Sequence, residues 1–100
     1  MSTANLSQAI VKHCEPVSQI LKAIAHPARL KILCCLMEGE KSVMELTEFC
    51  EASQSATSQF LARMKDEGLL VSRREHQFVY YGFADAKLAR LLKAIKEIYC

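Results

Sequence analysis

No run of apolar residues in this chain approaches the ~20 that a helix needs to cross a bilayer. The chain begins MSTANLSQAIVKHCEP, which has neither the positive start nor the long apolar centre of a signal peptide. We therefore expect a cytoplasmic protein without a membrane partner. Because that compartment is reducing, its five cysteines should not form structural disulfides, which leaves metal binding, redox chemistry or burial as their roles.

The sequence also has no Cys-x-x-Cys motif and no glycine-rich loop, and its three glycines are scattered. A nucleophilic cysteine would need a base that is oriented by a third group, and a cysteine in a helical core offers no pocket for a substrate. A thiol enzyme is therefore the weakest of the functions considered, and we expect no catalytic residue and no cofactor.

The chain has 100 residues, of which 51% are hydrophobic, and a net charge of +2. This length predicts a single domain over residues 1–100. The apolar content is high for so short a chain, which suggests that part of the surface is buried in an oligomer. The small net charge does not by itself indicate nucleic acid, although residues 54–100 are more basic than residues 1–53.

Apolar spacing and end signals predict mainly α structure with one β-hairpin. The first helix runs over 6–24 and either kinks at Pro16 or begins there. The second runs from Pro27 to Gly39, and a third spans 42–50 behind a Ser42–Glu45 capping box, with Val43, Leu46 and Phe49 inward. The remaining elements are a helix over 53–68, strands over 69–74 and 78–83, and a last helix from Asp85.

The stretch Ser53–Gly68 predicts a helix with two different faces. Ser53 suits an N-cap, and Gly68 suits the left-handed residue that ends a helix. Leu61 and Met64, with Ala56 or Phe60, form the buried side. The opposite side carries side chains of the kinds that contact base edges and phosphates, and we predict that these bind DNA: Gln54, Ser55, Thr57, Ser58, Gln59 and Arg63. The alternative is an ordinary surface helix whose polar side chains contact only solvent.

A short turn over 51–54 joins this helix to the one before it, which is the helix-turn-helix arrangement. The hairpin that follows would form a wing. Arg73 and Arg74 lie near its tip, and we predict that they contact the DNA backbone. A winged-helix module that binds only proteins is the alternative, but the Ser/Thr/Gln/Arg side weakens it.

The first and last helices keep apolar stripes that no other predicted element covers. Leu6, Ile10 and Val17 belong to the first stripe, and Leu88, Leu92 and Ile95 to the last. We therefore predict a homodimer through these two helices, and two-fold dimers suit palindromic DNA sites.

Three segments, LKAIAHPARLKILCCL, ASQSATSQFLARMKDEGLLVSRRE and VYYGF, together with the order of elements, resemble the ArsR/SmtB family of bacterial winged helix-turn-helix repressors. The resemblance covers nearly the whole chain. It implies a homodimer that binds operator DNA and leaves it when an inducer modifies the protein. Two departures affect operator preference rather than fold: Phe60 stands where members often have His, and His76-Gln77 stands where they often have Gly-Arg.

Metal-sensing members of the family often carry a Cys-x-Cys pair, where this chain has Glu45-Leu46-Thr47-Glu48-Phe49-Cys50. Other members use Asp, His and Glu ligands on the last helix, which here contains no His. Both sites therefore look absent, and we expect no metal. A thiolate and imidazole site built from His13, Cys14 and Cys50 stays open as the alternative function, a metal-responsive repressor.

Cys34 and Cys100 resemble the cysteine pair of the sulfide- and persulfide-responsive subgroup, which includes SqrR, BigR and HlyU. The resemblance implies that oxidation by a persulfide or another oxidant bridges them, through a disulfide or a polysulfide, and releases the DNA. Cys14, Cys35 and Cys50 are interpreted as structural. Taken singly, Cys34 is equally typical of a buried small hydrophobe, and Cys100 of a frayed terminal residue.

Overall fold

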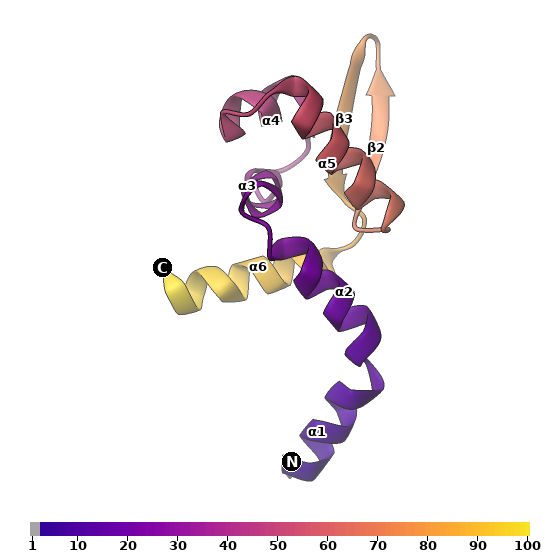
Figure 1. Ribbon diagram of the computed structural model, residues 1–100, viewed down its shortest axis with the longest axis vertical. Coiled ribbons are helices and arrows are strands. Elements are labelled where there is room, and N and C mark those ends of the chain that lie inside the picture. Colours follow the sequence, from indigo (N-terminus) through magenta and orange to yellow (C-terminus); the bar gives the residue numbers. More distant parts are fainter. Residues whose placement is uncertain (1–2) are drawn as a thin grey trace.

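The computed structural model of the protein describes residues 3–100. Figure 1 shows helices in most of the chain and a hairpin that projects from one end. The elements in chain order are α1 (Thr3–Lys12), α2 (Cys14–Ile24), α3 (Pro27–Leu36), β1 (Lys41–Ser42), α4 (Val43–Cys50), α5 (Gln54–Asp66), β2 (Leu70–Glu75), β3 (Phe78–Phe83) and α6 (Ala86–Tyr99). Over residues 3–100, no helix is both long and apolar enough to span a membrane.

The predicted first helix is two helices, because the chain bends at His13. The backbone of His13 has φ −115° and ψ 15°, which is not helical, and α2 begins at the next residue. Pro16 is the third residue of α2; it has no N–H to donate, and its ring would clash with the carbonyl of Lys12 in a continuous helix. The structure combines the two alternatives: α2 begins at Cys14 with Pro16 in its first turn, and the chain before the break is also helical. α1 projects away from the rest of the chain in Figure 1. The side chain of Leu6 lies outside the described residues.

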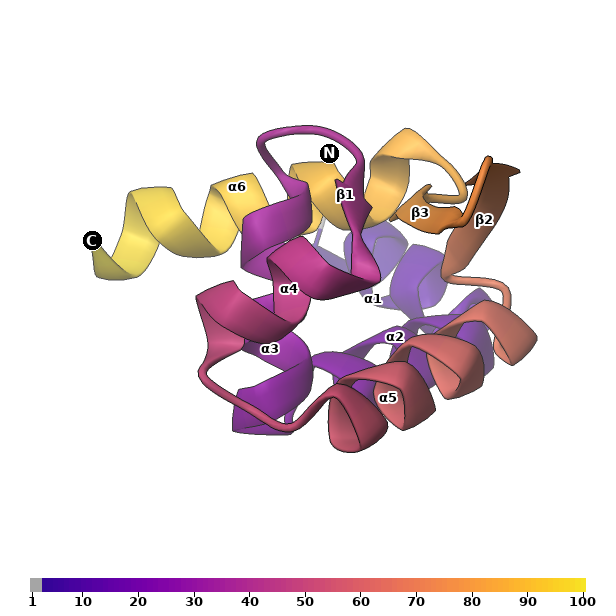
Figure 2. The ribbon, with the colours of Figure 1, turned by 90° about the horizontal axis from the view of Figure 1, so that it is seen from above.

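The core lies among α3, α4, α5 and α6. Figure 2 shows α6 along one side of the domain and α5 along the other, with α3 and α4 between them. The side chains buried in this core come mostly from those helices and include Ile32, Leu33, Leu46, Leu61, Met64, Leu88 and Leu92. The predicted inward positions Leu61, Met64 and Leu46 are therefore confirmed. Phe49 was predicted to point inward, but it is exposed.

Local end signals hold α4 and α5 in place. The Ser42 hydroxyl accepts a hydrogen bond from the Glu45 N–H at 3.1 Å, and the Glu45 carboxylate accepts one from the Ser42 N–H at 2.9 Å, which completes the predicted capping box. Ser53 caps α5 by accepting from the Ala56 N–H at 3.0 Å. Gly68 has φ 81°, as its place after the helix requires.

The sheet has one strand more than the sequence predicts. Its order is β1-β3-β2, with Lys41 opposite Tyr81 and Ser42 opposite Tyr80. The two long strands pair antiparallel from Leu70 and Phe83 to the hairpin end at Glu75 and Phe78. A strand of two residues is too short to show the alternation of apolar and polar side chains that identifies a strand. The sequence therefore predicts only the role of Ser42 as the N-cap of α4. The pairing with β1 anchors the middle of the wing to the chain segment that enters α4.

Replacing His76 by glycine is expected to stabilise the protein. His76 has φ 57° at the tip of the hairpin, a left-handed conformation that strains a residue with a Cβ atom. We expect His76→Gly to raise the free energy of unfolding by up to about 1 kcal/mol, the strain relief exceeding the entropy that glycine gains in the unfolded chain. Urea unfolding measures the change. Gln77→Gly is the control and should destabilise the hairpin, since Gln77 is not among the described residues with positive φ.

Candidate nucleic-acid interface and cysteine pair

The outer face of α5 is polar and open to solvent. The predicted DNA-binding residues with exposed side chains on this helix are Gln54, Ser55, Ser58, Gln59 and Arg63. The hairpin lies beside α5 (Figure 1), and the Lys65 ammonium donates a hydrogen bond to the Ser72 hydroxyl at 2.7 Å, which ties the helix to β2. The fold therefore presents one reading helix and one adjoining wing on a common side.

Thr57 does not belong to this exposed face. Its side chain is buried, at 1% exposure, and its hydroxyl donates a hydrogen bond to the Ser53 carbonyl at 2.9 Å. The prediction that Thr57 binds DNA is therefore corrected: it packs in the core beside Leu61. A threonine hydroxyl can donate a hydrogen bond to a backbone carbonyl of its own helix, so a polar side chain does not by itself show that a helix face is exposed to solvent.

Arg73 is also placed differently from the prediction, because two carboxylates already hold its guanidinium. Its Nε donates to both oxygens of Glu40, at 2.9 and 3.0 Å, and one terminal nitrogen donates to Glu75 at 2.8 Å. The guanidinium also stacks over the Tyr80 ring, 4.7 Å from its centroid. Arg73 thus brings no uncompensated charge to a phosphate. Arg74 is exposed and makes none of the ion pairs found in residues 3–100, so of the two it remains the predicted backbone contact.

Glu40→Gln is expected to strengthen DNA binding. The substitution removes a negative charge from beside the middle of the wing while Glu75 still holds the Arg73 guanidinium. DNA affinity should rise because the charge beside the wing becomes one unit more positive in each subunit, and the gain should shrink as salt screens that charge. Fluorescence anisotropy over a salt series measures both. Glu97→Gln on α6 is the matched control. An unchanged affinity at low salt for Glu40→Gln would contradict the idea that the charge of Glu40 opposes DNA binding.

The two predicted switch cysteines are both exposed, one on α3 and one at the end of α6. The pKa of the Cys34 thiol is raised, first by partial desolvation of its sulfur and second by the negative charge of Cys100. A charge on one thiol would therefore oppose ionisation of the other. The Cys100 N–H donates to the Lys96 carbonyl at 2.8 Å, so the residue still follows the helical path.

The other three cysteines divide into two kinds. Cys35 and Cys50 are buried, as predicted, and burial raises the pKa of each thiol. Cys14 was predicted to be structural, but it is exposed at the start of α2. Among residues 3–100, no group of three or more His, Cys, Asp and Glu side chains could hold a metal ion. The alternative site built from His13, Cys14 and Cys50 is therefore not assembled within the subunit.

The helix-turn-helix of α4 and α5, followed at once by the β2–β3 hairpin, defines a winged helix-turn-helix protein of the DNA-binding class. A family model described as "Bacterial regulatory protein, arsR family" matches residues 26–72, from the cap of α3 into β2. The chain belongs to the ArsR family and is a transcriptional regulator, as the resemblance implied.

The known relatives match nearly the whole length of the chain. A biofilm growth-associated repressor from Agrobacterium fabrum is 39% identical over 92 residues, which are 92% of this chain and 79% of the relative. The crystal structure of the repressor BigR from Xylella fastidiosa has a TM-score of 0.87 at 33% identity, covering 100% of this chain and 98% of that one. The structure of reduced HlyU from Vibrio cholerae has a TM-score of 0.84 at 38% identity, covering 93% and 98%.

Proposed function

We propose that the protein is a homodimeric transcriptional repressor that reads operator DNA with the exposed face of α5. The observation that carries the proposal is the set of short polar side chains on that face, beside a wing that bears Arg74. Ser55, Ser58 and Gln59 would contact base edges in the major groove, while Arg63 and Arg74 neutralise phosphates. The relatives named as repressors support the direction of regulation.

The proposed dimer interface uses α1, α2 and α6. These helices leave large apolar side chains exposed, among them Ile10, Val11, Leu21, Ile98 and Tyr99. A single subunit offers α1 no extended packing partner (Figure 1), and an amphipathic helix gains most of its stability from such packing. A second copy that covers these faces would also set the spacing of two α5 helices on a palindromic site.

Binding of the reduced protein to double-stranded DNA tests this function. Sedimentation equilibrium gives the oligomeric state, and fluorescence anisotropy compares a duplex from upstream of the protein's own gene with a scrambled duplex. We expect a dimer that prefers the native duplex by at least about 10³-fold, with an affinity that falls steeply with salt. Equal, salt-independent affinity for both duplexes would defeat the DNA-binding function.

The signal that we propose is an organic persulfide, RSSH. The Cys34 thiolate would attack its outer sulfur, releasing RSH and leaving Cys34 as a persulfide. The Cys100 thiolate would then attack the Cys34 sulfur, and hydrosulfide would leave. Two protein thiols and one RSSH become one protein disulfide, one RSH and one H2S. With a second RSSH, which would convert Cys100 to a persulfide as well, the two protein persulfides would join as a trisulfide bridge, and the products would be two RSH and one H2S. The support is the exposure of both thiols and the likeness of the chain to BigR and HlyU.

Mass spectrometry after separate exposure to a persulfide, to peroxide and to a small disulfide tests the signal. A sulfur sensor should yield a Cys34–Cys100 linkage with persulfide and little with the other two reagents, whereas a general redox sensor should yield it with all three. Absence of a linkage between these two residues under every reagent would remove the switch and leave the DNA-binding function intact.

The rate at which Cys34 reacts should depend on pH. The thiolate is the nucleophile, and the pKa of Cys34 is raised, so at neutral pH only a small fraction of this residue is ionised. Below that pKa, the rate of alkylation of Cys34 by iodoacetamide should rise about tenfold for each pH unit. Timed quenching and peptide mass spectrometry measure it. In Cys100→Ser the second cause of the raised pKa is absent, so in the alkaline range, where thiols ionise, Cys34 should react faster than in the parent. An equal rate there would show that Cys100 does not affect the ionisation of Cys34.

A further inference from the structure

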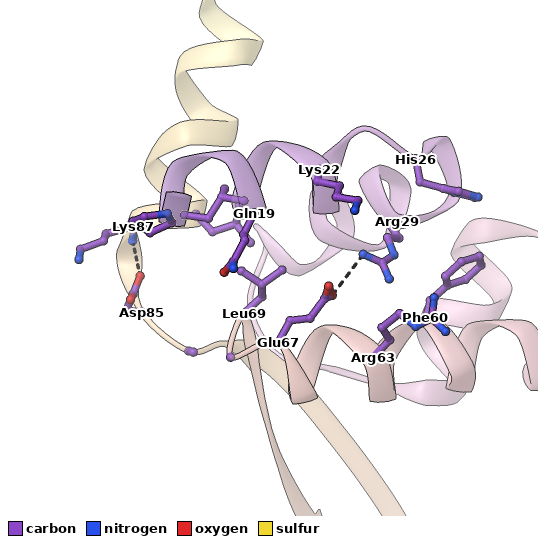
Figure 3. Close-up of a pocket in the computed structure, with 15 residues that line it drawn as sticks. Gln19, Lys22, His26, Arg29, Phe60, Arg63, Glu67, Leu69, Asp85 and Lys87 are labelled. Carbon is purple, nitrogen blue, oxygen red and sulfur yellow. Dashed lines mark hydrogen bonds and ion pairs between the residues drawn. The ribbon is translucent and has the colours of Figure 1, made fainter. Parts of the chain in front are cut away.

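A groove separate from the cysteine pair opens between α2, the start of α3, α5 and the start of α6 (Figure 3). Its volume is about 1010 Å³, at the upper end of the range for small-molecule sites. Residues from four helices line it, so it is a product of the tertiary fold rather than of one segment. Of the residues that line it, only Arg63 belongs to the proposed DNA contacts, and neither Cys34 nor Cys100 lines it.

The polar lining of the groove is mostly cationic. Lys22, Arg29, Arg63 and Lys87 line it, against the carboxylates of Glu67 and Asp85. Asp85 is already engaged, because it caps α6 by accepting a hydrogen bond from the Lys87 N–H at 2.8 Å. Lys22, Arg29 and Arg63 lie at one end of the hollow, and Lys87 lies beside Asp85 at the other (Figure 3). Such a lining favours an anionic ligand and disfavours a cation.

Arg29 is the buried charged residue of this site. Its residue is 8% exposed, and its guanidinium makes one hydrogen bond, from a terminal nitrogen to a Glu67 oxygen at 3.2 Å. Figure 3 shows its side chain directed into the groove towards Glu67. A guanidinium has five donors, so a buried arginine with one protein partner keeps donors in the hollow for an incoming oxyanion. The ion pair with Glu67 fixes the orientation of those donors without neutralising the other cations.

The rest of the lining is apolar. Ile20, Phe60, Leu69 and Leu88 contribute side chains, and the Phe60 ring lies against the His26 ring, with 5.0 Å between their centroids. An ion such as phosphate would leave this part of the hollow without a partner. A ligand with an apolar body and one charged end would cover both parts, burying hydrocarbon against the apolar side chains while its head accepts from Arg29.

We propose that this groove binds an organic carboxylate with an apolar body, its carboxylate on Arg29 between Lys22 and Arg63. Arg63 is also one of the residues proposed to neutralise DNA phosphate, so a bound carboxylate should weaken DNA binding; this part of the inference rests on the proposed function. By linkage, DNA would weaken carboxylate binding by the same factor. The groove would then carry a second input, independent of Cys34 and Cys100.

Titration of the reduced, full-length protein with octanoate, followed by ¹H–¹⁵N correlation spectra in the absence of DNA, tests the site. The amides of residues that line the groove should shift and saturate, and acetate and 1-octanol, which lack either the body or the charge, should bind at least about tenfold more weakly. Shifts confined to α1 and the end of α6 would overturn the proposal, since octanoate would then only coat the exposed apolar faces.

Charge substitutions separate a site from general attraction to a basic protein. The double variant Lys22→Gln/Lys87→Gln should weaken octanoate binding about tenfold or more. The control Lys93→Gln/Lys96→Gln removes the same charge from the far part of α6 and should change it less than twofold. Equal losses in the two variants would overturn the site. Because these titrations contain no DNA, they remain informative if the DNA-binding function fails.

Discussion

Exposure to an organic persulfide is expected to lower the DNA affinity of the unmodified protein by about 5- to 150-fold, the range for a typical allosteric coupling, and Cys34→Ser should abolish this response. Cys34 lies on α3, which packs against α4, the first helix of the helix-turn-helix. Cys100 ends α6, a helix of the proposed dimer interface. A covalent link between them would fix α6 relative to the reading head and so change the separation of the two α5 helices.

The other cysteines of the chain provide matched control substitutions. Cys100→Ser should be as unresponsive as Cys34→Ser, because either substitution removes one end of the bridge. Cys14→Ser removes another exposed thiol, on α2, and should respond like the unmodified protein. All three reduced variants should bind DNA with the affinity of the reduced parent, measured by anisotropy. A Cys34→Ser variant that still loses DNA on persulfide treatment would refute the pair as the switch.

The parts of the fold that the sequence predicts are those decided by neighbours in the chain. Ser42 and Glu45 form a capping box because a hydroxyl and a carboxylate three residues apart reach each other's backbone N–H, whatever the rest of the chain does. Ser53 and Gly68 bound the recognition helix for similar local reasons. The winged helix-turn-helix follows from the order of such elements, which is why the fold class was predictable.

The parts that the sequence does not predict depend on residues distant in the chain. Arg73 looks like a free cation beside Arg74 until folding brings Glu40 to it through the unpredicted β1 strand. Thr57 looks like a reading residue until the packing of α5 buries it. The signal that could have identified Thr57 is its spacing from Leu61 and Met64, four and seven residues away, which places all three on one helical face.

The groove was also beyond the sequence, because its four cations come from four separate helices. Arg29 lies among apolar residues of α3 and has no sequence neighbour to suggest its role; its partner Glu67 follows α5. The cysteine pair was suggested only by the family resemblance. The spacing of Cys34 and Cys100 in the sequence carries no information about their distance in the folded chain, and only the structure shows that both thiols are exposed.

Gln59→Ala is expected to weaken binding to the specific duplex by about 5- to 150-fold for each half-site, the range for one good amide contact to a base, and to leave binding to a scrambled duplex within about twofold. Gln59 is exposed on α5, and its amide can donate and accept in one plane, as recognition of adenine requires. The truncation leaves the buried side of the helix, with Leu61 and Met64, unchanged. Thermal unfolding should therefore match the parent protein.

Arg74→Ala provides the contrast, because a phosphate contact and a base contact fail differently. It should weaken specific and scrambled duplexes by a similar factor and reduce the salt slope by about one for each subunit. Anisotropy titrations with both duplexes at several salt concentrations distinguish the two patterns. If Gln59→Ala reduced both affinities equally, α5 would be acting only as a polar surface against the backbone. The reading of sequence would then have to reside elsewhere on the protein, with Ser55 and Ser58 as the residues to substitute next.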